Sequence, residues 1–149
     1  MNTYSQIVGY IEDAANKHLA IKSFAEGPIS YLDSNSQNIR YPFIFLRPLV
    51  STGLVGNIRT LNFELYSLDV PKLSNESPTL IKSNTELYIY DIMSYLRFNN
   101  TDTPYGVDFI LGNIIPVNEA FNDRVYGWTA NISVTEDAVY NYCNYPDGV

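Results

Sequence analysis

The segment from Arg124 to Glu136 alternates between two kinds of side chain. One set is apolar and consists of Tyr126, Trp128, Ala130, Ile132 and Val134. The set between them is polar and consists of Thr129, Asn131, Ser133 and Thr135. Because successive side chains of a strand point to opposite faces, this pattern predicts a β-strand with one apolar and one polar face. The fold must therefore supply other elements to cover the apolar face.

Three further strands are predicted, over residues 41–47, 60–69 and 107–116. The first carries the run Phe43–Leu46, which is apolar on both faces and indicates burial on both sides or cover from a neighbouring subunit. The first two strands are expected to pair as an antiparallel hairpin. In the second, the apolar positions change phase, which predicts a bulge or strong bend near Tyr66 and Ser67. Gly112 and Gly127 permit further bends or a close approach of two backbones.

Two amphipathic helices are predicted, over residues 3–22 and about 78–99. The second has Ser77 as its N-cap and Pro78 in its first turn. Its inner stripe is expected to include Ile81, Tyr88, Ile92, Tyr95 and Leu96, widened by Leu80, Leu87 and Phe98. The chain therefore belongs to the α+β class, with two helices and about four strands.

Composition and charge limit the classes of function. The 149 residues suffice for one domain, expected over 1–136 and followed by a tyrosine-rich tail over 137–149. The net charge of −7 argues against broad binding of phosphate backbones. Eight basic and nine acidic residues give residues 1–98 a net charge of −1, whereas one basic and seven acidic residues give 99–149 a net charge of −6. The acidic part is either a solvated face or a surface that avoids polyanions or meets a basic partner.

No motif for catalysis, metal binding or cofactor binding stands out, so we expect neither an enzyme nor a cofactor. Cys143 is the only cysteine, which excludes an intrachain disulfide and cysteine-based zinc sites. His18, the only histidine, is expected to have a structural role. Asp91 is expected to be a structural acid paired with a tyrosine or arginine, and a small enzyme using Asp91 or Glu64 as acid or base is a distant option.

Several features are typical of surfaces that bind other proteins. The chain has 13 tyrosines, a residue that combines apolar area with a polar group. Leu54 and Val55 lie between two glycines, and we expect this hairpin tip either to insert into a neighbour or to fold back onto its own sheet. The expected contact residues are Leu54, Val55, Tyr105, Tyr140, Tyr142 and Tyr145. The tyrosines of the tail would cover either their own sheet or another subunit.

The order helix, hairpin, helix, hairpin and short tail resembles the tail terminator (tail completion) and neck proteins of tailed bacteriophages. The resemblance covers roughly residues 3–136 and includes three short tracts: YPFIFLRP at 41–48, RTLNFELY at 59–66 and YGWTANISV at 126–134. It implies two helices packed on a curved, mostly antiparallel sheet. It also implies a homo-oligomeric ring in the virion neck, between head-connector and tail proteins, that assembles in the bacterial host cytoplasm and does not involve a membrane.

In such a ring, DNA passes through the lumen without specific binding. A wall with net negative charge releases no counterions from phosphates, so we expect residues 99–149 to line it. The candidate lumen residues are Asp102, Asp108, Glu119, Asp123, Glu136 and Asp137. The alternative is a non-catalytic soluble adaptor or binding module that acts as a monomer or dimer.

Overall fold

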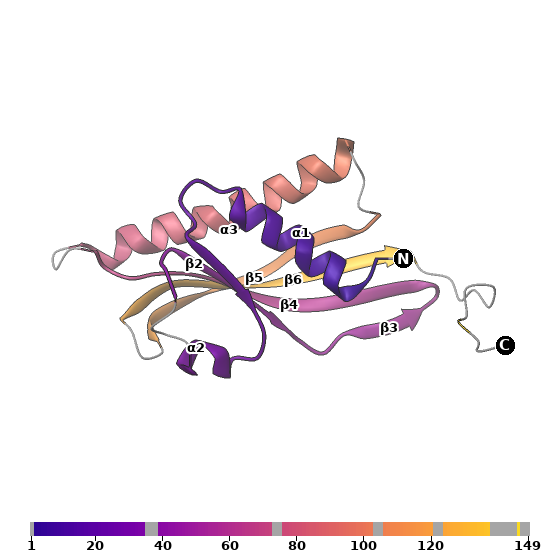
Figure 1. Ribbon diagram of the computed structural model, residues 1–149, viewed down its shortest axis with the longest axis horizontal. Helices are drawn as coiled ribbons and strands as arrows, with labels where there is room; N and C mark the ends of the chain where they lie inside the picture. Colours follow the sequence, from indigo (N-terminus) through magenta and orange to yellow (C-terminus); the bar gives the residue numbers. More distant parts are fainter. Residues whose placement is uncertain are drawn as a thin grey trace.

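A six-stranded sheet carries two long helices on one face in the computed structural model (Figure 1). The structure describes residues 2–34, 39–72, 76–102, 106–120, 124–137 and 146. Within these ranges the elements, in chain order, are α1 (Tyr4–Asn16), β1 (Ser23–Glu26), α2 (Ser30–Ser34), β2 (Phe43–Pro48), β3 (Thr52–Val55), β4 (Ile58–Asp69), α3 (Pro78–Asp102), β5 (Asp108–Ala120) and β6 (Val125–Asp137).

The sheet has the strand order β1-β2-β4-β6-β5, and β3 pairs with the first part of β4. β1 is parallel to β2, whereas the other pairings are antiparallel. The central pair β4–β6 keeps one register from Ile58 opposite Asp137 to Asp69 opposite Tyr126. The α+β class and the antiparallel pairing of 41–47 with 60–69 are thus confirmed, whereas the expected four strands and two helices are too few.

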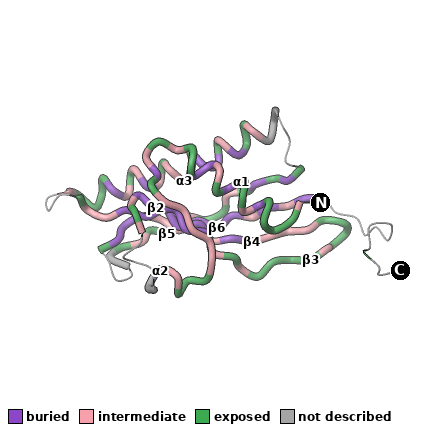
Figure 2. Tube along the Cα trace, viewed as in Figure 1, coloured by how far each residue is buried: buried purple, intermediate pink, exposed green. Residues whose placement is uncertain are grey.

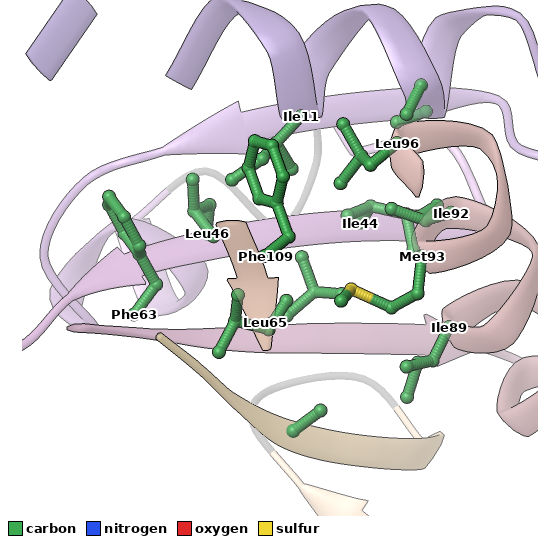
Figure 3. Close-up of a cluster of buried hydrophobic side chains, with 14 of the residues drawn as sticks. Ile11, Ile44, Leu46, Phe63, Leu65, Ile89, Ile92, Met93, Leu96 and Phe109 are labelled. Carbon is green, nitrogen blue, oxygen red and sulfur yellow. The ribbon is translucent and has the colours of Figure 1, made fainter. Parts of the chain in front are cut away.

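The main core lies between the sheet and helices α1 and α3. Figure 2 shows buried chain concentrated where these helices cover the sheet. Apolar side chains from both helices and from β2, β4 and β5 meet there (Figure 3): Ile11, Ile44, Leu46, Phe63, Leu65, Ile89, Ile92, Met93, Leu96 and Phe109. This core packs α1 and α3 against strands β2, β4, β5 and β6.

A second, smaller core lies on the opposite face of the sheet, beside α2. Its buried residues are Leu32, Phe43, Phe45, Tyr66, Leu68 and Val125. It explains why the run Phe43–Leu46 is buried on both faces, as the sequence predicts. It also corrects the bulge expected at Tyr66 and Ser67, because β4 keeps its register with both neighbours there. The apolar phase changes because a different face of β4 becomes covered.

The first helix is shorter than expected. It begins with a capping box, in which Thr3 accepts from the backbone of Gln6 and the Gln6 side chain accepts from the backbone of Thr3. It ends at Asn16, six residues before the predicted end, where the backbone N–H of His18 donates to the Ala15 carbonyl, three residues back, and that of Ala20 donates to the His18 ring. The backbone N–H of Lys22 then donates to the Pro42 carbonyl at 2.8 Å. This bond aligns the chain with β2 and starts β1, a strand that the sequence analysis missed.

Two glycines fit the sheet as predicted. A Cβ atom on Gly127 would lie 1.9 Å from the Ser67 carbonyl oxygen, so the close approach of β4 and β6 requires glycine. Gly112 lies where β5 shifts register between Leu111 and Ile114, which is the local bend expected there. Gly127 thus allows β4 and β6 to approach closely, and Gly112 allows β5 to bend.

Candidate functional site

The outer face of α3 carries large apolar side chains. Leu80, Leu87 and Phe98 are 53%, 57% and 68% exposed. Their separations of seven and eleven residues place them on one side of the helix. The buried residues Ile89 and Leu96 project from the other side. The prediction that Leu80, Leu87 and Phe98 widen the inner stripe is therefore wrong, because α1 and the sheet already fill the space against the opposite side of α3.

The face of the sheet opposite the helices is partly open. Beyond the small core beside α2, polar residues of β4 and β6 alternate with the buried ones, as the sequence predicts for β6. Ile110 and Ile115 of the edge strand β5 are exposed on this face, because their neighbours Phe109 and Ile114 point to the helical core. One chain therefore has exposed apolar residues on both sides of its sheet.

An open hollow of about 490 Å³ includes in its lining Ser133, the residue of β6 that lies opposite Ile110. Val50 and Leu49 form part of its wall, and Asn62 lies in its floor with Asn131, Ile132, Ser133 and Phe63. The Asn62 side chain donates to the Val50 carbonyl at 3.0 Å and accepts from the Ser133 hydroxyl at 2.9 Å. These bonds fix the segment that connects β2 to β3 against the sheet.

Leu54 and Val55 lie in strand β3 and do not form the hairpin tip, which corrects that part of the prediction. The turn between β3 and β4 consists of Gly56 and Asn57, whose φ angles are 57° and 66°. Two residues with positive φ form the tight turn that a two-residue hairpin favours. Val55 is 66% exposed and Leu54 is half-buried, so Val55 is free to contact another molecule.

Glu136 is buried, in contrast to the solvent-exposed position expected of a lumen residue. Its carboxylate pairs with the guanidinium of Arg59, which lies directly opposite it on β4. The same carboxylate accepts from the backbone and side chain of Asn2, at 3.2 and 3.1 Å. The Asn2 side-chain oxygen in turn accepts from the Tyr10 hydroxyl at 2.6 Å. Glu136 therefore joins the N-terminal segment to the end of the sheet and contributes no surface charge.

Two other candidate lumen residues, Asp108 and Asp137, lie beside Glu136 at the same end of the sheet. Both carboxylates are exposed and line an open hollow of about 360 Å³, together with Ile58, Gly106, Val107, Thr135 and Glu136. Asp108 lies opposite Thr135, two residues from Asp137, so both aspartates project from the open face. The structure thus gathers two acids that are 29 residues apart in the sequence.

The structure locates only some of the other residues expected to line the lumen or to make contacts. Asp102 belongs to α3 and Glu119 to β5, but their side chains are not among those described. Asp123, Tyr105, Tyr140, Tyr142 and Tyr145 lie outside the described residues. Their roles as lumen or contact residues stay predictions.

The residues considered for acid–base chemistry have structural partners. Asp91 accepts from the ring Nε2 of His18 at 2.8 Å, whereas a tyrosine or arginine partner was expected. The other ring nitrogen of His18 accepts from the backbone N–H of Ala20 at 3.1 Å. Glu64 pairs with Arg47 at 3.3 Å and accepts from the Tyr66 hydroxyl. Burial, followed by the bond to Glu64, raises the pKa of Tyr66 to about 12.

Among the described residues, histidine, cysteine, aspartate and glutamate form no group of three or more that could hold a metal ion. The helices in the same part of the chain lack the combination of length and apolarity needed to span a bilayer.

No protein-family model matches the chain, and no curated protein matches it.

Proposed function

We propose that this chain is a structural virion protein that forms a ring in the neck or tail connector of a tailed bacteriophage. The observation that carries the proposal is the presence of two unlike apolar surfaces on opposite sides of one sheet. The first surface is the outer face of α3, with Leu80, Leu87 and Phe98. The second is the open sheet face along β5, with Ile110 and Ile115.

Two unlike surfaces favour head-to-tail association. A two-fold dimer buries the same patch on both subunits, whereas a heterologous contact buries one patch of each kind and repeats around a ring. Large apolar side chains exposed on a helix and on an edge strand are also typical of protein interfaces. The occupant of each surface is thus a second copy of this chain, and the resemblance of the sequence to tail terminator and neck proteins supports the same proposal.

The charge of the chain suits a part through which DNA passes. With a net charge of −7, the subunit offers no excess of lysine and arginine to neutralise phosphates and release their counterions. A ring of such subunits repels a polyanion in its channel and lets it move. Head-connector proteins on one side and tail proteins on the other are the proposed neighbours.

Native mass measurement over a range of protein concentrations tests the ring. We expect a closed oligomer of defined copy number. A chain that stays monomeric or dimeric at high concentration contradicts the ring and favours the adaptor or binding module.

The apolar surface of α3 has a matched control. Leu87→Ser and Leu19→Ser remove the same side chain from exposed positions, on α3 and in the segment before β1. We expect Leu87→Ser to weaken the oligomer and Leu19→Ser, at a residue that is 97% exposed, to leave it unchanged. Equal effects of the two substitutions would contradict the use of the α3 face.

A further inference from the structure

We propose that the acidic end of one subunit receives the basic edge of the next, so that Asp108 and Asp137 contact Lys22 and Arg40 of a second copy. This inference rests on the proposed ring and names the contact that orients its subunits. It removes Asp108 and Asp137 from the lumen residues expected from the sequence.

The acidic side of the contact is a hollow with uncompensated charge. Asp108 and Asp137 project from neighbouring strands on the open sheet face, and neither takes part in the ion pairs found among the described residues. The third acid of the hollow, Glu136, is neutralised by Arg59. Strands β5 and β6 contain no lysine or arginine, so the local charge is negative. A hollow of about 360 Å³ accommodates a long basic side chain.

The basic side lies where β1 and β2 begin. Lys22 directly precedes β1, and the Ser23 hydroxyl donates to the Arg40 carbonyl, which brings the two basic residues to the same end of this parallel pair. Both residues are exposed, and neither takes part in the ion pairs found among the described residues.

The two charged surfaces cannot meet within one chain. Asp137 lies opposite Ile58 at the start of β4, whereas Phe43, which opens β2 after Arg40, lies opposite Leu68 near the end of β4. The two surfaces are therefore ten residues, or roughly 33 Å, apart along this strand. In Figure 1 the start of β5 and the end of β6 lie at the right of the sheet, away from the loop that leads from α1 into β1. Opposite charges at opposite ends of the sheet give each subunit one basic and one acidic surface, which is the arrangement that a head-to-tail ring requires.

Paired charge reversal tests this contact in the full chain. One variant carries Lys22→Glu and Arg40→Glu, and the other carries Asp108→Lys and Asp137→Lys. Each variant alone would place like charges against each other, so we expect self-association to weaken on the order of 100-fold. Lys22→Glu is also measured alone and compared with Lys72→Glu, which makes the same change of charge at another exposed position and should leave self-association unchanged.

Mixing the two double variants in equal amounts decides the question. In a head-to-tail contact, the unaltered hollow of the first variant meets the unaltered basic edge of the second, and the two reversed surfaces also attract. We therefore expect native mass measurement to find mixed assemblies with equal numbers of both variants. Recovery on mixing also shows that both variants fold.

Every other result contradicts either the charged contact or the ring. If the natural chain assembles and both double variants assemble equally well, or if both fail and mixing restores nothing, the charged contact is wrong while the ring stands. If the natural chain does not assemble at any concentration, the proposed ring itself is wrong.

Discussion

Replacing Glu136 with glutamine tests whether its carboxylate is a buried structural group or a solvated charge of the lumen wall. Arg59 is 16% exposed and Glu136 is 3% exposed in their side chains, so their pair is largely removed from water. Removing one partner of a buried ion pair leaves the other charge uncompensated and costs about 3–5 kcal/mol. The amide of glutamine would also face a donor, since both carboxylate oxygens of Glu136 accept hydrogen bonds.

We expect Glu136→Gln to lower the free energy of unfolding by about 3 kcal/mol, the lower end of that range, because Arg59 keeps some contact with solvent. For a chain of this size the melting temperature would fall by roughly 9 °C. Urea unfolding at low protein concentration measures the change without a contribution from association. The double variant Arg59→Met/Glu136→Leu removes both charges and should cost much less than the two single changes together.

Asp108→Asn is the matched control, because Asp108 lies at the same end of the sheet with an exposed carboxylate. Its effect on unfolding should stay within about 0.5 kcal/mol. If Glu136→Gln is as harmless as Asp108→Asn, the carboxylate of Glu136 is solvated and the structural role assigned to it is refuted.

Three further predictions concern the sheet, the pH dependence and the helix surface. Gly127→Ala should lower the free energy of unfolding by about 3 kcal/mol in a urea titration, because its Cβ would overlap the Ser67 carbonyl. An unchanged midpoint would refute the close approach. Because burial raises the pKa of Tyr66 from 10.0 to about 12, the contribution of Tyr66 to stability is complete below pH 10 and is lost as the pH rises through 12. Tyr66→Phe should therefore make the free energy of unfolding fall less over this interval. An unchanged slope of the free energy of unfolding against pH would contradict the assignment. Phe98→Ser should change the free energy of unfolding by less than about 0.5 kcal/mol while weakening the oligomer in native mass measurement, and unaltered assembly would exclude this side chain from the interface.

The sequence predicted the strands whose side chains follow a simple pattern. The segment around Trp128 alternates because the helical core covers one of its faces and the other is open. The strand β1 has no such pattern, since all four of its residues are half-buried and it is only four residues long. The phase change near Tyr66 predicts a bulge or strong bend because the sequence does not reveal that α2 and its neighbours cover the other face.

The site was less predictable than the fold, because it depends on register. Arg59 and Glu136 are 77 residues apart and meet only because β4 and β6 pair in one particular alignment. The same alignment, extended to β5, brings Asp108 beside Asp137. Helical spacing alone places Leu87 on the side of α3 opposite Ile89 and Leu96. Only the packing of α3 decides which of these two sides faces the sheet, and it buries Ile89 and Leu96.

A reconstruction of the native virion that contains this chain tests the proposed function most directly. The proposal predicts a closed ring of copies between the head connector and the tail, with β5 of each subunit facing β1 of the next and a central channel wide enough for DNA. Absence of the chain from the particle, or single copies outside the neck, would contradict it.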